Sequence, residues 1–405
     1  MRIGIVAAPG PEVAGLAVRA EALGFDSFWV YDTPMVYGDP FVGLALCAGA
    51  TRRIRLGIGV TSPALRSAPA AAAAVGSLNA LAPGRIICGV GTGNTARRAL
   101  GMRPTKLAEL EAFAAELRDL TAGREVAHRE RGRSSRVRFL HVGPYVDIAA
   151  PVEFVVAAFG PKAAAVAGRL GAGLISFGLH DPAAWSALGE ARRAAAREGA
   201  READGARRGA GREEGGADGV GSAGSASGVS GVSGATETDG ADGADRGDGA
   251  DGGGGAGRVG GARSYLISAL HVLADGADRY GDPVRDSVGH IALGALVLGA
   301  EEPAFRAGLP PAEAAAVDRL LAMRGTTATD PRLHQALYRN YLGRPSVAER
   351  ELIVPSLVDR FGLVGTRSEV VGRIEALERA GVDELLIQPV VDPERQMVEF
   401  ARLLG

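Results

Sequence analysis

The sequence has few cysteines and almost no net charge. Its 405 residues include two cysteines, Cys47 and Cys88, and apolar surroundings predict that both are reduced core residues. A disulfide framework or a zinc site would need more cysteines, so the sequence indicates no metal. The formal net charge is -2 at pH 7. This balance gives no electrostatic reason to expect nucleic acid or an anionic membrane as a partner.

The sequence also predicts neither a targeting segment nor a membrane-spanning segment. Residues 1–8 precede the first expected helix and are too few for a signal-peptide core. The longest uncharged stretch, residues 67–83, is rich in alanine and contains Pro69, Gly76 and Asn79. It is typical of a buried helix and not of a membrane span. We therefore expect a soluble, cytoplasmic protein.

Short apolar runs alternate with helical patterns along most of the chain. Eight runs have the continuous apolar character of strands buried on both faces of a parallel sheet, at residues 1–7, 27–31, 54–61, 86–90, 152–158, 173–178, 263–273 and 384–391. Eight strand–helix units predict an α/β fold of the (β/α)8 barrel type, with a doubly wound open sheet as the main competitor. A basic segment at residues 124–148 interrupts this alternation and predicts a hairpin with a solvated turn.

Two long segments interrupt the second half of the chain. Residues 199–262 consist mainly of Gly, Ala, Ser, Asp, Arg and Glu, and cannot bury enough apolar surface to offset their ordering entropy. We predict a disordered insert there, at the barrel face opposite the active site. Residues 282–362 form a helical block after the seventh strand, where it would roof the pocket. Strands one to six then occupy residues 1–198, and strands seven and eight occupy residues 263–405.

The fourth expected strand ends in the sequence Gly89-Val90-Gly91-Thr92-Gly93-Asn94. Glycines at the carboxyl end of a strand let the backbone approach a ligand closely, and ligands of parallel α/β sheets bind at that end. The spacing does not match the dinucleotide fingerprint, and no Gly-Lys-Ser/Thr follows as in a P-loop. Taken alone, the loop fits a strand-to-helix turn without a ligand equally well.

Four segments together resemble the luciferase-like flavin and deazaflavin (F420)-dependent oxidoreductases, and within them the methylenetetrahydromethanopterin reductase-like branch. They are residues 57–63 (Gly-Ile-Gly-Val-Thr-Ser-Pro), 89–94, 159–163 (Phe-Gly-Pro-Lys-Ala) and 365–385. The resemblance covers nearly the whole chain outside the predicted insert. It implies a barrel enzyme that binds coenzyme F420, or alternatively FMN, at the carboxyl ends of its strands.

The resemblance also implies a cofactor site built from several strand ends. A non-proline cis peptide would fall at Gly59-Val60, behind the ring system, and Asn94 would contact the ring where an Asp is commoner. Amides at the start of the helix after the fifth strand would hold the cofactor phosphate, with Phe159 where a serine is usual. The implied cofactor-binding residues are Asp32, Gly59, Val60, Thr61, Gly91, Thr92, Gly93, Asn94, Ala158, Phe159, Gly160 and Pro161.

Few residues are candidates for chemistry or substrate contact. Asp32-Thr33 stands where an Asp-His pair is frequent in the family, so a histidine acid/base is missing there. The catalytic candidates are Asp32, which could instead cap a turn, and Asn94, which can donate to a ring carbonyl but cannot act as an acid or base. The substrate candidates are Thr33, His334 and Tyr338. The last two recur with Tyr341 at helical spacing in the expected roof, although such residues more often pack locally.

The function that these features predict is an F420-dependent oxidoreductase. It would transfer a hydride between C5 of the cofactor and a carbon of a small organic substrate. An FMN-dependent luciferase-like monooxygenase is the alternative. A flavin-binding barrel without catalysis is a third reading, favoured by the missing ionisable residues. The resemblance further implies a homodimer formed through the helices beside the second and third strands.

Overall fold

The computed structural model describes residues 1–213 and 262–403, so most of the predicted insert lies outside the described residues. Eight parallel strands form the sheet of the barrel: β1 (Arg2–Ala7), β2 (Ser27–Val30), β3 (Arg55–Thr61), β4 (Ile86–Val90), β7 (Glu153–Ala157), β8 (Gly173–Phe177), β9 (Ser264–Val272) and β11 (Glu384–Ile387). They pair in the order β1-β2-β3-β4-β7-β8-β9-β11, and the β11–β1 pairing closes the ring. The predicted (β/α)8 barrel is confirmed, and each predicted apolar run contains one of these strands.

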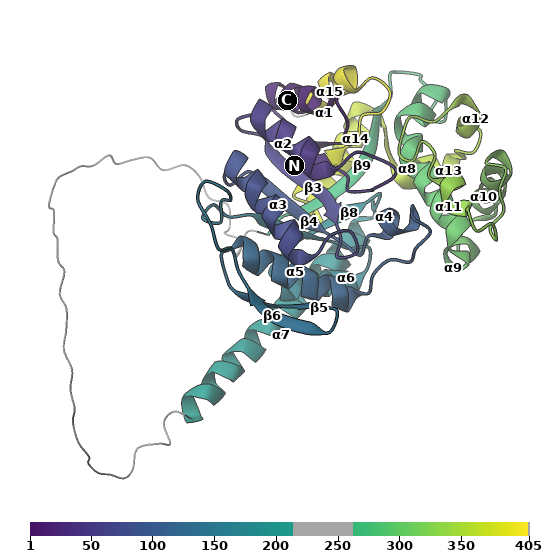
Figure 1. Ribbon diagram of the computed structural model, residues 1–405. Coiled ribbons are helices and arrows are strands. Elements are labelled where there is room, and N and C mark those ends of the chain that lie inside the picture. The colour runs from purple at the N-terminus through teal and green to yellow at the C-terminus, as the bar shows by residue number, and fades with distance from the viewer. Residues whose placement is uncertain (214–261, 404–405) are drawn as a thin grey trace, which may run out of the picture. The chain divides into compact units, whose positions relative to one another are not determined.

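Helices on the outside of the barrel follow most of the strands (Figure 1). They are α1 (Val13–Ala22), α2 (Pro40–Ala50), α3 (Ala68–Leu81), α4 (Asn94–Arg98), α5 (Leu107–Thr121), α6 (Pro161–Arg169), α7 (Pro182–Glu213), α14 (Arg367–Arg379) and α15 (Pro393–Ala401). Among the described residues, no helix is long and apolar enough to cross a membrane. The prediction that disorder begins at residue 199 is wrong at its start, because α7 continues to Glu213. The composition argument considered burial alone, whereas the Ala, Arg and Glu residues there are strong helix formers.

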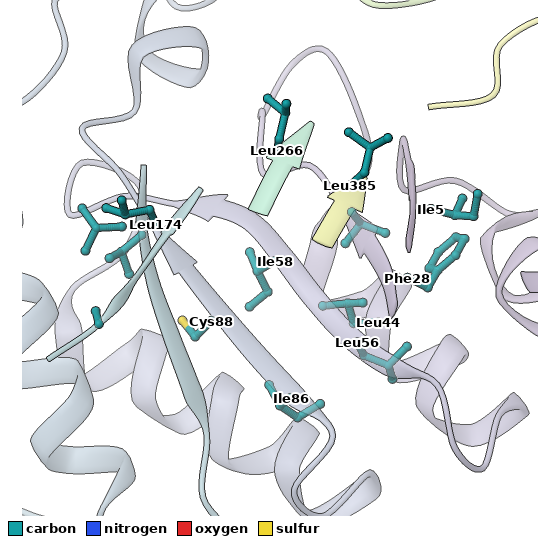
Figure 2. Close-up of a cluster of buried hydrophobic side chains, with 14 of the residues drawn as sticks. Ile5, Phe28, Leu44, Leu56, Ile58, Ile86, Cys88, Leu174, Leu266 and Leu385 are labelled. Atoms are coloured by element: carbon teal, nitrogen blue, oxygen red, sulfur yellow. The ribbon is translucent and has the colours of Figure 1, made fainter. Parts of the chain in front are cut away.

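Alternate strand residues form two separate apolar layers. Side chains that point outward, such as Ile5, Phe28 and Ile58, meet helix residues such as Leu44, and Figure 2 shows this cluster of buried side chains. Their neighbours along the strands point inward and fill the barrel, as Val6 and Trp29 do. Because side chains alternate with a period of two, a strand that is buried on both faces must be apolar throughout. This explains the unbroken apolar runs of the sequence.

The predicted hairpin between the fourth and fifth barrel strands is also present. It consists of β5 (Val126–Glu130) and β6 (Arg133–Val137), which pair in antiparallel fashion. The turn residues Arg131 and Gly132 both have positive φ angles, 48° and 78°. Most of the hairpin side chains are exposed, in agreement with the expected solvated turn.

A helical block follows β9 and has an apolar core of its own. Its helices are α8 (Asp282–Glu301), α9 (Pro303–Ala307), α10 (Pro311–Met323), α11 (Leu333–Leu337), α12 (Val347–Arg350) and α13 (Pro355–Phe361), which gather beside the barrel in Figure 1. The block ends in a short strand, β10 (Gly362–Gly365), which the sequence reading did not anticipate. It pairs with residues 269–272 of β9, which β11 leaves free because β11 pairs only with residues 265–268.

Candidate functional site

A cavity of about 710 Å³ lies at the carboxyl ends of the barrel strands. One wall comes from the ends of β2, β3, β4, β7, β8 and β9 and the loops that follow them. The other wall comes from the helical block, through α8, α9, residues 341–342 and residues 360–361. This is the size of a pocket for a cofactor or a drug-sized ligand.

The structure brings most of the predicted site residues together at this cavity. Those that line it are Asp32, Thr33, Gly59, Val60, Gly91, Thr92, Gly93, Asn94 and Phe159. Those that do not line it are Thr61, Ala158, Gly160, Pro161, His334 and Tyr338. Thr61 and Ala158 are fully buried, while Gly160 and Pro161 lie at the start of α6, directly after the lining residue Phe159.

The cavity floor is formed where β3 and β4 run side by side. The peptide bond between Gly59 and Val60 is cis, as the resemblance implied, and the β3–β4 register shifts between Ile58 and Thr61. A Cβ atom at Gly91 would lie 2.7 Å from Val60 Cγ2. One at Gly89 would lie 2.7 Å from Val60 Cγ1 and closer still to the backbone carbonyl oxygen of Ile58. Glycines are therefore required on β4 and its exit so that the Val60 side chain can occupy the floor.

The next turn of the chain presents Asn94 at the cavity wall. Gly93 precedes α4 with a φ angle of 71°, a conformation that favours glycine. The side chain of Asn94 accepts a hydrogen bond at Oδ1 from Arg98 Nε (2.8 Å). Arg98 is itself bound by the carboxylate of Glu302. This orientation leaves Nδ2 of Asn94 available as a donor.

Asp32 is the only carboxylate on the cavity wall formed by the described residues. Its side chain is 2% exposed, and Arg66 Nη1 donates to its Oδ2 at 2.6 Å. Arg66 also binds Asp39, at 2.5 Å, and its guanidinium lies 4.5 Å from the centre of the Phe41 ring. Burial raises the pKa of Asp32, and the charge of Arg66 offsets part of that increase. Asp39, and not Asp32, is the residue that caps a helix here.

Tyr341 reaches the cavity from the helical block, whereas the predicted His334 and Tyr338 do not. Tyr338 donates to Glu301 Oε2 at 3.1 Å, and the ring of His334 packs against Gly101. The prediction assumed one continuous helix, but α11 ends at Leu337 and the turn after it contains positive φ angles. Helical spacing therefore does not relate these three side chains.

Several further polar residues at the cavity were not predicted, and Arg360 and Ser176 are two of them. Arg360, at the end of α13, lines the cavity and pairs with Glu313 Oε2 at 3.1 Å. Ser176, on β8, lines it with a buried hydroxyl that has no hydrogen-bond partner among the described residues. No motif marks either residue, because their positions depend on how distant elements pack.

The protein family follows from comparison with known proteins. The family described as luciferase-like monooxygenase matches residues 4–213, which is about half of the chain. The chain belongs to this family. The match begins at β1 and ends with α7, so it includes the floor at Val60, the glycine loop and the start of α6.

Similar curated proteins are matched over only part of their length. An F420-dependent glucose-6-phosphate dehydrogenase of Intrasporangium calvum is 37% identical over 179 residues, which are 41% of this chain and 54% of that protein. A 5,10-methylenetetrahydromethanopterin reductase of Methanolobus tindarius is 40% identical over 90 residues, 22% of this chain and 27% of the relative. The chain thus spans about half, or less, of the curated relatives it matches.

Solved structures resemble this chain in fold over nearly its whole length. The coenzyme F420-dependent tetrahydromethanopterin reductase of Methanopyrus kandleri superposes with a TM-score of 0.60 at 16% identity, over 99% of this chain and 97% of that one. An F420-dependent secondary alcohol dehydrogenase also gives 0.60, at 15% identity and the same coverage. At these identities the likeness establishes the fold alone.

Proposed function

We propose that this protein is an F420-dependent oxidoreductase that transfers a hydride between coenzyme F420 and a small organic substrate. The observation that carries the proposal is the cavity floor, where the Val60 side chain lies against the glycines of β4 and its exit. This floor lies in the region that matches the family, and several relatives of the chain bear the name of F420-dependent enzymes.

The residues of the cavity fit a tricyclic cofactor that carries a phosphate. Val60 lines the cavity and would provide an apolar surface for the ring, and Asn94, whose Oδ1 is bound by Arg98, would provide an amide donor. The start of α6, next to Phe159, offers backbone amides to an anion, as helix N-termini do. The unpartnered hydroxyl of Ser176 on the same cavity supplies a further donor. It would replace the serine hydroxyl that Phe159 lacks.

The bound cofactor would supply the hydride chemistry, and the chain would supply position, dryness and one proton site. Val60 and Asn94 would fix the ring, so that the substrate carbon approaches it in one geometry. Tyr341, Leu342 and Phe361 would cover the opposite side and exclude water. Asp32 would accept a proton at Oδ1, since Arg66 occupies Oδ2.

Assembly and location belong to the same proposal. Neither α2 nor α3 contains a charged residue, and on α2 Val42 is 63% exposed and Leu46 51% exposed. This supports a homodimer that buries the two helices, which light scattering of wild type and Leu46→Glu would test.

The buried free cysteines Cys47 and Cys88 fit a reducing compartment, the cytoplasm. We propose small molecules as its ligands, and neither nucleic acid nor membrane.

Titration with oxidised F420 and, separately, with FMN tests the proposed function. We expect fluorescence changes that give a micromolar Kd for F420 and at least tenfold weaker binding of FMN. Tighter binding of FMN would move the function to oxygen chemistry of the monooxygenase type. Binding of neither would leave a barrel without the proposed cofactor site.

A further inference from the structure

The part of the cavity wall formed by α8 is apolar and uncharged. Ile291, Gly294, Ala295 and Leu298 all line the cavity. Their spacing of three, four and seven residues places them on one face of the helix. Phe305, Leu342 and Phe361 extend this surface. Apart from the Tyr341 hydroxyl and the guanidinium of Arg360, the wall opposite the strand ends is therefore built from hydrocarbon groups.

The two charged residues that line the cavity are already paired. Asp32 is bound by Arg66 and Arg360 by Glu313, and no Lys or His lines the cavity among the described residues. The start of α6 offers backbone amides to the cofactor phosphate. A second anionic group, on the substrate, would need an unpaired cation of its own. The cavity offers none to spare, so an anionic substrate would be poorly stabilised.

Gly294 leaves part of the α8 surface empty. A Cβ atom there would lie 3.5 Å from Tyr341 Oη and 3.6 Å from Leu342 Cδ2, which are ordinary contacts, and the backbone is helical. By contrast, a Cβ atom at Gly299 of the same helix would lie 2.9 Å from Val317 Cγ2. Packing thus explains the glycine at 299 but not the one at 294, where the missing side chain adds to the cavity.

We propose that the substrate is an uncharged, largely apolar alcohol or the corresponding ketone, and that Gly294 sets its size limit. The inference rests on the proposed function and names its substrate class. In the oxidative direction the alcohol carbon loses a hydride to oxidised F420, and the hydroxyl loses its proton to Asp32 and then to water. The products are the ketone and reduced F420, and the reverse reaction reduces the ketone.

Binding of a graded set of ligands to the F420-loaded protein tests the substrate class. The set is cyclohexanol, 1-phenylethanol and menthol, with glucose 6-phosphate as the anionic counterpart, each followed by calorimetry. We expect affinity to rise with apolar size among the alcohols, and at least tenfold weaker binding of glucose 6-phosphate. Tighter binding of the sugar phosphate than of every alcohol would overturn the proposal.

Variants at position 294 test the size limit. We expect Gly294→Leu to weaken menthol binding at least tenfold and cyclohexanol binding less than threefold, with Gly294→Ala between wild type and the leucine variant. Gly372→Leu on the exposed face of α14, where nothing lies within 4 Å, is the matched control and should change neither. Equal losses for both alcohols in Gly294→Ala and Gly294→Leu would overturn the role of Gly294.

Titration of each variant with F420 separates this inference from the proposed function. Unchanged F420 affinity in a position-294 variant shows that it is folded and that any loss of menthol concerns the substrate side. If wild type binds no F420, the proposed function fails. The alcohols are then titrated into the protein alone, where the same order of affinity supports the apolar cavity and the reverse order overturns it.

Discussion

At position 91 the approach of two strands leaves no room for a side chain. The Cβ atom of an alanine would lie 2.7 Å from Val60 Cγ2 and 3.1 Å from the Cβ of Ala157. Overpacking of this kind typically costs about 1–3 kcal/mol. We expect Gly91→Ala to push Val60 out of place and to weaken F420 binding about tenfold, which is about 1.4 kcal/mol. Fluorescence titration measures the change.

A control for Gly91→Ala is available on the outside of the barrel. Gly372 lies within α14, is exposed, and has nothing within 4 Å of its would-be Cβ. Gly372→Ala should leave F420 binding unchanged and raise stability by about 0.5–1 kcal/mol, because glycine is unfavourable inside helices. If Gly91→Ala bound F420 as tightly as wild type, Val60 would not form the floor of the cofactor site.

Glu384 is a buried acid at the other end of the barrel, at the start of β11. It accepts a hydrogen bond from Ser27 at Oε1, whereas Oε2 has no hydrogen-bond partner among the described residues. Burial raises the pKa of Glu384 to about 7, against the opposing effects of Ser27 and Arg55. The folded state therefore holds a proton that the unfolded state releases near its ordinary pKa of 4.5.

The free energy of unfolding should consequently fall as the pH rises from about 4.5 to about 7. The shift of Glu384 corresponds to a loss of about 3 kcal/mol over that range, with little further change from this group above it. Glu384→Gln should remove this slope, as urea unfolding between pH 5 and pH 8 would show. Glu375→Gln on the exposed face of α14 should keep it. A slope that Glu384→Gln leaves intact would rule out Glu384 as its source.

At the scale of elements, the turn after α11 is tied to the barrel by two hydrogen bonds. Tyr37 Oη donates to the carbonyl of Tyr341, and Gln388 Nε2 donates to the carbonyl of Leu342 at 2.8 Å. Tyr31 Oη donates to Gln388 Oε1, also at 2.8 Å, and so holds the amide in place. These bonds position Tyr341 and Leu342 over the cavity.

Gln388→Leu should loosen this part of the roof without altering the floor. It leaves the Leu342 carbonyl and the Tyr31 hydroxyl unpaired, and each unsatisfied buried group costs about 1–3 kcal/mol. We expect amide hydrogen exchange in residues 338–343 to rise about tenfold and substrate affinity to fall, while F420 affinity changes less than threefold. Tyr280→Phe, which removes an exposed bond to Asp359, is the control. Unchanged exchange in Gln388→Leu would show that the roof does not depend on this tie.

For the whole molecule, the barrel strands could be predicted because burial on both faces leaves a continuous apolar run, as in β4 (Ile86–Val90). The part of the site at the strand ends could also be predicted, because the carboxyl ends of parallel strands meet at one edge of the barrel. The strand β10 could not be predicted, because its four residues form a strand only beside the free half of β9. The sequence did not indicate Arg360, and it left Tyr341 uncertain. Both residues reach the cavity through tertiary packing, which no local pattern in the sequence records.

The last prediction concerns residues 214–261, which lie outside the described residues. Every residue that lines the cavity belongs to residues 1–199 or 262–405, the unit that contains the barrel. If the segment is disordered, as its composition predicts, a flexible linker of about twenty residues changes the closure free energy by less than about 1 kcal/mol, because the cost grows with the logarithm of length. We therefore expect its replacement by a Gly-Ser linker of that length to keep the Kd for F420 within twofold and the unfolding midpoint within a few degrees. A large loss of F420 binding in a variant with an unchanged midpoint would mean that the segment contributes directly to the cofactor site.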